Sequence, residues 1–405
     1  MTEKHFFTNL PYLITISLAT LAIWYFKVED IGMLVFAGIV FLLLLLVKNT
    51  IYTLPFMLNM LFMISQTEWN LSEIPLYLYI VPALLILGFI AHTIIYKVRV
   101  FGGSLFVGLL WLAIAAIIST AINSFALDMT TLLIFIVAVF FVYLYAFLAN
   151  TLKGDHVLYL IKIFVILGAM IAIQVTLFYL NPDIDIIDAI ETKKLDLGWG
   201  ISNFVATYLI MFIATTTYFV KKYKMHIFWI LLALFEVVTL LFTLSRAGII
   251  AFMLTTVLLV VYMFVKYEHK WNLLLNLLIG IAIFIGLGFL FKEYFITIWE
   301  RIDLYGLDDN GRIELWQEAW TKFNENRVFG AGVFAREAEN EWRMFHNTVL
   351  NIMAWFGSFG LVALLIQFIA IIRVFFTKLT QEKAILLIAL IGANMHGMVD
   401  NIYMM

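Results

Sequence analysis

The sequence predicts an all-α polytopic membrane protein with about 12 to 13 transmembrane helices, and two observations predict it. Of its 405 residues, 64% are hydrophobic and only 13% are charged, against roughly 45–50% and 25% in a soluble domain. Apolar runs long enough to cross a hydrocarbon core of roughly 30 Å recur along the chain. A single helical bundle therefore explains the length better than two or three soluble domains.

Charged or turn residues bound the apolar runs and give about 13 expected spans. The runs cover residues 11–26, 31–47, 50–64, 75–96, 104–122, 129–149, 157–180, 201–220, 226–244, 247–265, 272–291, 347–372 and 384–403. The short third run and the last run could instead be re-entrant. We expect residues 1–291 to form an N-terminal transmembrane bundle of about 11 spans, residues 292–346 one long, partly helical external loop, and residues 347–405 the C-terminal transmembrane helices.

Lysine and arginine predict the orientation, because cytoplasmic loops carry the excess of basic residues. With the N-terminus inside, thirteen fall in inside loops: Lys4, Lys48, Lys97, Arg99, Lys153, Lys221, Lys222, Lys224, Lys266, Lys270, Arg373, Lys378 and Lys383. Only Lys27, Lys193, Lys194 and Arg246 fall in short outside loops. The N-terminus is therefore expected in the cytoplasm and residues 292–346 outside. The first span lacks a small-residue cleavage site, so we expect it to be retained.

Composition and motifs exclude several classes of function. The net charge is −2 and no basic run resembles a phosphate-backbone footprint, so nucleic acid is not an expected partner. The chain has no cysteine, which rules out disulfides, thiolate metal sites and a cysteine nucleophile. A GxxxxGK[ST] loop, an HExxH motif, metal-like carboxylate pairs and a GxSxG elbow are all absent. We therefore expect no metal and no cofactor.

The long external loop carries its own structure signals. Asp308, Asp309 and Asn310 are acidic and capping residues of the kind that begin a helix. After them, apolar residues recur on one helical face, which we expect to lie on the membrane surface or on the top of the bundle. These residues are Ile313, Trp316, Trp320 and Phe323. Gly330-Ala331-Gly332 then breaks the chain.

Two arginines could bind an anion. Arg246 falls between two apolar runs with almost no loop, where an arginine usually faces a cavity or a partner; snorkelling to the interface is the alternative. Arg312 begins the loop helix and offers a rigid fork for phosphate oxygens, whereas an ion pair with Asp308 or Glu314 would be purely structural.

Two histidines and two acids complete the candidates. His346 lies where the polar loop enters a hydrophobic span, and could act as a general base or simply bond to backbone. His396 and Asp400 are four residues apart in the last span, so a carboxylate there could orient the histidine, bind a polar substrate or form a structural pair. Glu236 sits alone in mid-span, a weak sign of a proton site. The Gly357 and Gly360 pair indicates close packing.

Taken together, the residues resemble the O-antigen ligase and O-antigen polymerase superfamily of bacterial membrane glycosyltransferases. The resemblance covers about residues 240–365 and rests on the order of four pieces. These are Ser245-Arg246-Ala247-Gly248, Gly311-Arg312 with Trp316, Gly330-Ala331-Gly332, and His346-Asn347-Thr348-Val349-Leu350 with Gly357 and Gly360. It implies a GT-C-like fold in the cytoplasmic (inner) membrane of a bacterium.

The resemblance also implies an activity. The donor would be a glycan on undecaprenyl diphosphate, transferred to a glycan acceptor at the outer membrane face with inversion and without metal. His346, Arg312 and Arg246 match the family's essential residues, with His346 as base and the arginines on the diphosphate. We expect substrate binding by a further set: Asn347, Trp316, Ser245, His396 and Asp400. Membrane lipids, and the flippase and chain-length regulator of the same pathway, are the other expected partners.

Three alternatives compete with a polymerase that makes a surface polysaccharide such as capsule or exopolysaccharide. A ligase would use the same residues and differ in its acceptor. A lipid or polysaccharide transporter would scatter ionisable residues through mid-membrane and show inverted repeats. A peptidoglycan polymerase would need an acidic catalytic residue in an external loop, which the sequence does not place.

Overall fold

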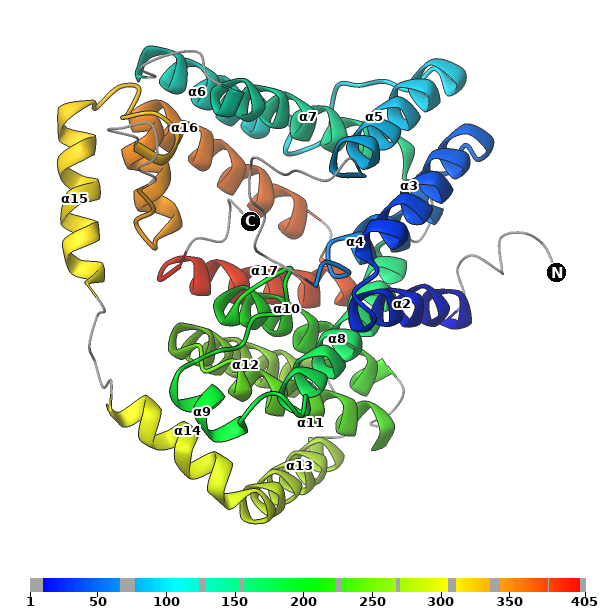
Figure 1. Ribbon diagram of the computed structural model, residues 1–405, viewed down its shortest axis with the longest axis vertical. Coiled ribbons are helices and arrows are strands. Elements are labelled where there is room, and N and C mark those ends of the chain that lie inside the picture. Colours follow the sequence, from blue (N-terminus) through cyan, green and yellow to red (C-terminus); the bar gives the residue numbers. More distant parts are fainter. Residues whose placement is uncertain are drawn as a thin grey trace. The chain divides into compact units, whose positions relative to one another are not determined.

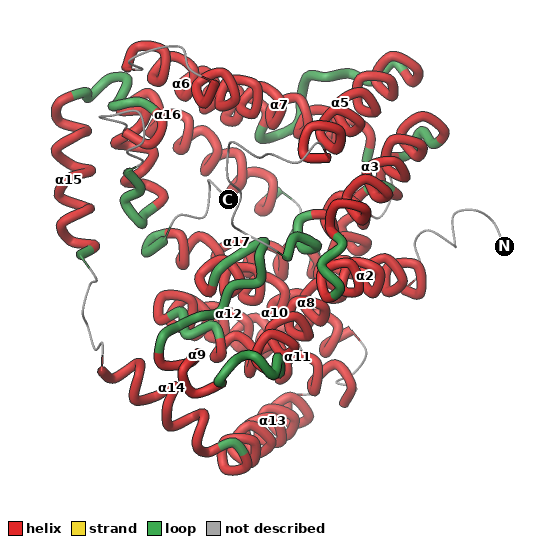
Figure 2. The backbone as a smooth tube through the Cα atoms, in the orientation of Figure 1, coloured by secondary structure: helices red, strands yellow, loops and turns green. Residues whose placement is uncertain are grey.

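The computed structural model describes residues 10–65, 77–123, 129–152, 156–222, 227–266, 270–304, 311–335, 343–377 and 379–400. In these ranges the chain consists of helices joined by loops, and it forms no strand (Figure 2). The prediction of an all-α polytopic membrane protein is confirmed, because many of these helices are apolar and of membrane-spanning length.

Seven of the described helices are long and apolar enough to cross a membrane. They are α3 (Glu29–Leu46), α5 (Tyr77–Tyr96), α6 (Phe106–Asn123), α8 (His156–Tyr179), α10 (Ser202–Lys222), α12 (Arg246–Lys266) and α16 (Thr348–Phe376). Helices α13 (Lys270–Leu290) and α14 (Lys292–Leu304) meet at a bend of 91° and make an eighth span if counted together. Shorter apolar stretches are α2 (Leu10–Tyr25), residues 135–151 of α7 (Met129–Thr151), and α11 (Ile227–Phe242).

Two of the expected runs differ from the structure. The run at 50–64 contains a 3₁₀ turn, Thr50–Tyr52, and the 7-residue helix α4 (Leu54–Met60), which rises only about 10 Å and cannot cross a membrane. The last run begins as α17 (Gln381–Gly397) but leaves the helix before Asp400, which lies in the bend that follows. Asp400 therefore does not continue the helical face that carries His396.

The chain forms two compact units that interleave along the sequence. Unit 1 comprises Met1–Ala91, Lys153–Gly306 and Gln381–His396, and unit 2 comprises His92–Leu152, Leu307–Thr380 and Gly397–Met405. In unit 1, α10 packs against α8, α11 and α12 (Figure 1). The short helix α9 (Ile186–Glu191) packs against α14, so part of one long segment predicted to be external contacts part of the other.

Unit 2 is built on α6, which packs against both α7 and α16. Helix α15 (Arg312–Glu325) lies against α16 (Figure 1). Phe345 and Trp355 are completely buried in this core, and Ala319 is the fully buried residue of α15. Ile313 and Trp320, on the face predicted to lie on the membrane surface or on the top of the bundle, are more than half exposed.

Gly357 breaks α16 into two segments, with φ of 62° and ψ of −154°, a conformation that essentially only glycine adopts. The break lets the loop after α15 bond to the helix backbone: Ser358 N–H donates to the Arg327 carbonyl (2.7 Å) and Ala331 N–H to the Ala354 carbonyl (2.8 Å). A Cβ on Gly330 would lie 2.4 Å from the Trp355 carbonyl group. The two glycine motifs of the sequence therefore face each other and allow this close contact.

Candidate active site

His346 stands immediately before α16 and is held by its two chain neighbours. The Phe345 N–H donates to Asn351 Oδ1 (2.8 Å). Asn347 is the N-cap of α16, and its Oδ1 accepts from the N–H groups of Val349 (2.9 Å) and Leu350 (3.0 Å). A side-chain oxygen at this position satisfies helix N–H groups that have no partner within the helix. The histidine is thus fixed at the start of a membrane helix.

The imidazole of His346 pairs with a carboxylate 54 residues further along the chain. Its Nδ1 lies 3.1 Å from Asp400 Oδ1, and the side chains are 41% and 4% exposed. An ionised carboxylate only accepts hydrogen bonds, so it places the proton on Nδ1 and leaves Nε2 with a lone pair. His346 also has φ of +46°, an uncommon backbone conformation for a residue other than glycine. An imidazole oriented by an acid in this way is an arrangement that a general base can use.

The segment after α17 is tied to the same place. Asn347 Nδ2 donates to the Met398 carbonyl (2.7 Å), so the N-cap of α16 holds the chain two residues before Asp400. Asp400 therefore bonds to His346, whereas its spacing in the sequence had suggested His396 as the partner. Its role in the site stays a prediction. Local spacing could not reveal this pairing, because it joins residues far apart in the chain.

Arg312 is the first residue of α15, as its position in the sequence suggested. The N-cap is Gly311, with φ of +73°, and the predicted capping residues Asp308, Asp309 and Asn310 lie outside the described ranges. Arg312 is half-buried, and among the described residues it forms no ion pair with Glu314.

Trp316 lies one turn after Arg312 in α15. Its indole Nε1 is buried and has no hydrogen-bond partner in the described part of the chain. Buried donors are nearly always paired, so this one is suited to a polar ligand. Arg343, three residues before His346, pairs with Glu318 of α15 at 3.5 Å, which links this helix to the histidine segment.

Arg246 is the first residue of α12, after a turn in which Leu244 has φ of +56°. Ser245 precedes it, and the Ser245 hydroxyl accepts from the Gly248 N–H (3.2 Å) as a helix cap. The helix dipole makes this end attractive to anions, and the positive charge of the arginine adds to that.

His396 holds this turn from the side. Its ring is completely buried, with Nδ1 2.6 Å from the Thr207 hydroxyl and Nε2 3.3 Å from the Ser245 hydroxyl. Both nitrogens are therefore engaged, which favours positioning of the Ser245–Arg246 turn over direct contact with substrate. Thr207 could not be identified from the sequence, because a threonine within an apolar helix is common.

The candidates thus divide between the two units. Unit 2 brings together His346, Asn347 and Asp400 by direct bonds and carries Arg312 and Trp316 on α15; unit 1 joins Ser245 to His396 beside Arg246.

Glu236, the possible proton site, is completely buried in α11 of unit 1. Thr216 donates to its Oε1 (3.1 Å), and its Oε2 has no hydrogen-bond partner among the described residues. A Cβ on Gly168 of α8 would lie 2.5 Å from Oε1, so this glycine makes room for the carboxyl group.

One comparison with known proteins finds a match. Comparison with curated proteins and with solved structures finds no match. Residues 227–365 match the family model described as O-antigen ligase. The matched region begins with α11 and includes the Ser245–Arg246 turn, α15 and the His346 segment. This match, over about a third of the chain, supports the resemblance to the O-antigen ligase and polymerase superfamily.

Proposed function

We propose that this protein polymerises undecaprenyl diphosphate-linked oligosaccharide repeat units into a surface polysaccharide at the outer face of the cytoplasmic membrane. The observation that carries the proposal is the His346–Asp400 pair, whose imidazole is anchored at the start of a membrane helix and partly exposed. Such a base suits a reaction in which a sugar hydroxyl must lose a proton as it attacks.

The reaction needs little beyond this base. The acceptor hydroxyl oxygen bonds to the anomeric carbon, the bond from that carbon to the diphosphate oxygen breaks with its electron pair, and the configuration inverts. His346 Nε2 takes the hydroxyl proton, and the imidazolium later returns it to solvent. Arg246 and Arg312 stabilise the negative charge that develops on the leaving diphosphate. Diphosphate is already a good leaving group, so we propose neither a metal ion nor a covalent intermediate.

The remaining residues serve the reacting groups. Asp400 orients His346 and stabilises its charged form, and Asn347 fixes both the helix start and the chain before Asp400. Trp316 Nε1 is proposed to donate to the substrate, since it is buried without a partner among the described residues. Ser245 and His396 position Arg246.

A ligase that passes the glycan to a lipid or another acceptor is the second candidate, because the matched family model is described as O-antigen ligase. It would use the same base and arginines. A transporter is the third, and the buried Glu236 is the feature that favours it.

The test is a reaction with purified protein in nanodiscs, undecaprenyl diphosphate-linked repeat units and EDTA, with products resolved on a gel. We expect a ladder of polymers, lowered roughly 10²- to 10⁴-fold by His346→Ala while the variant still binds the donor. His156→Ala, at the start of α8, is the control and should leave the ladder intact.

Each other outcome points elsewhere. Transfer of single units to an added lipid acceptor without a ladder would favour the ligase. If the donor stayed intact with every acceptor tested, both the polymerase and the ligase proposals would be contradicted, and the transporter would be the remaining candidate. A full ladder from His346→Ala would remove this histidine as the base.

A further inference from the structure

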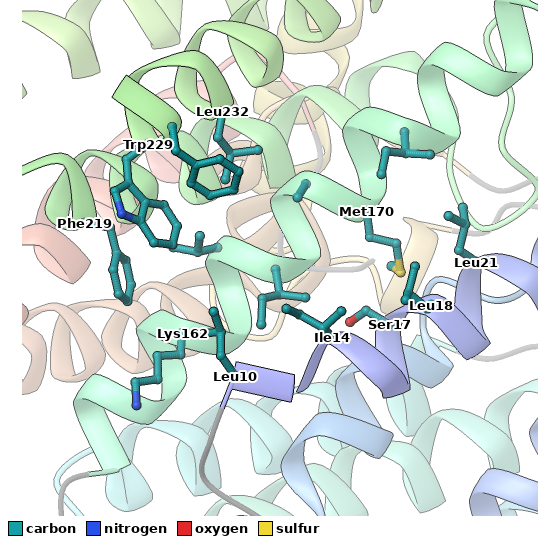
Figure 3. A pocket seen from close by; sticks show the side chains of 15 residues that line it. Leu10, Ile14, Ser17, Leu18, Leu21, Lys162, Met170, Phe219, Trp229 and Leu232 are labelled. Carbon is teal, nitrogen blue, oxygen red and sulfur yellow. The ribbon is translucent and has the colours of Figure 1, made fainter. Parts of the chain in front are cut away.

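An apolar groove runs along unit 1 between α2 and α8, and α10 and α11 close one end of it (Figure 3). We call it the α2–α8 groove. It has a volume of about 180 Å³ and is open along one side. Its lining is hydrophobic apart from Ser17 and Lys162. In a membrane protein, a groove of this composition faces lipid.

The groove has the length of one membrane leaflet. Lys162 lies beside Leu10 at one end, and Met170 lies beside Leu21 towards the other (Figure 3). Leu10 and Leu21 are eleven positions apart in α2, which is about 16 Å along a helix. The hydrocarbon core is roughly 30 Å thick. The groove therefore fits a single lipid chain that enters from one membrane surface and ends near the midplane.

Lysine and aromatic residues gather at one end of the groove. Phe219 is near the last turn of α10, and Trp229 is in the first turn of α11, so both lie close to helix ends. Lys162 is in the second turn of α8. Tryptophan and lysine at this level of a membrane helix are typical of the headgroup region.

A second lysine belongs to this end. Lys222 follows Phe219 by three positions, which places both on one side of α10. Its Nζ lies 5.6 Å from the centre of the Tyr218 ring. Among the described residues, the acid of this region is Glu382, which accepts from the Tyr218 hydroxyl (2.6 Å). Lys162 and Lys222 outnumber it, so the described part of this end of the groove is cationic.

We infer that the α2–α8 groove binds an anionic phospholipid, with one acyl chain in the groove and its phosphate at Lys162 and Lys222. The distribution of basic residues in the loops predicts that this end faces the cytoplasm. The lipid would then occupy the leaflet opposite the proposed chemistry, so it is a bound structural lipid and not the glycan donor. A polyprenyl carrier is the competing occupant, and its chain is much longer than one leaflet.

The experiment measures bound lipid by native mass spectrometry after incubation with equimolar phosphatidylglycerol and phosphatidylcholine. We expect the wild type to retain phosphatidylglycerol preferentially. Lys162→Gln should lower that retention about fivefold and leave phosphatidylcholine unchanged. The control is Lys266→Gln, an exposed lysine at the end of α12 outside the groove, which should behave as wild type.

A second variant tests the groove itself. Ala169→Phe places a ring among the lining residues and should reduce retention of both lipids. Ile14→Trp serves the same purpose if gel filtration shows that Ala169→Phe does not fold.

Three results would overturn the inference. Equal retention of the two lipids by the wild type would show that the headgroup is not selected. Unchanged phosphatidylglycerol in Lys162→Gln would remove the lysine from the site. Displacement of phosphatidylglycerol by equimolar undecaprenyl phosphate would assign the groove to the polyprenyl carrier.

Discussion

At the scale of single residues, the bond between His346 Nδ1 and Asp400 decides which imidazole nitrogen is free to act. An asparagine at position 400 can still bond to Nδ1, but its amide group can also donate and thereby stabilise the wrong tautomer. We therefore predict that Asp400→Asn lowers turnover roughly ten- to hundredfold, with little change in the KM for the donor. Steady-state kinetics of chain extension would measure both constants.

A matched variant distinguishes loss of His346 orientation from a general folding defect of the protein. Asp400→Glu keeps the acceptor-only carboxylate and should recover part of the turnover lost in Asp400→Asn. If Asp400→Asn raised the KM and left turnover unchanged, the carboxylate would contact the substrate and not act through His346.

Arg246 allows a second test at this scale. Lysine keeps the positive charge but lacks the planar fork that binds two phosphate oxygens at once. We predict that Arg246→Lys lowers kcat/KM about tenfold or more, whereas Arg373→Lys, an exposed residue in the last turn of α16, leaves it unchanged. If both variants were as active as the wild type, Arg246 would not bind the diphosphate, and its side chain would only extend to the membrane interface.

At the scale of helices, hydrophobic runs predicted where most elements lie, because length and composition largely determine which segments can enter a membrane. Helix α16 begins at Thr348, within one residue of the expected start of the run 347–372, and the structure shows Asn347 as its N-cap. The break at Gly357 was hidden inside the run 347–372. It depends on the backbone of Val328 and Gly330, which contact α16 from another part of the chain.

The break at Gly357 gives a prediction about stability. Alanine at this position would have to adopt φ of +62° and place its Cβ 2.6 Å from the Val328 carbonyl carbon. We predict that Gly357→Ala lowers the melting temperature in detergent by several degrees, since such strain costs about 1–3 kcal/mol. Gly286→Ala in α13, where a Cβ meets nothing within 4 Å, should melt like the wild type or slightly higher. Equal melting of the two variants would contradict a structural role for the break.

At the scale of the whole molecule, composition was enough to predict the fold class, and the candidate residues were found by motif. Their grouping was not predictable in the same way. The pairing of His346 with Asp400 and the burial of His396 between Thr207 and Ser245 depend on contacts across long stretches of sequence. Hydropathy ranks segments by their affinity for lipid, and it carries no information about which polar side chains meet.

Membrane orientation is the property of the whole molecule that the sequence predicts and that remains to be measured. The packing of α9 against α14 supports placing both long polar segments on one side. Since the chain has no cysteine, single cysteines can be introduced without background. We predict that Glu191→Cys and Glu314→Cys react with a membrane-impermeant maleimide in intact cells, whereas Lys48→Cys and Lys266→Cys react only after lysis. The reverse pattern would place the proposed chemistry in the cytoplasm. If only Glu191→Cys were labelled in intact cells, α15 would not be accessible from the outside as predicted.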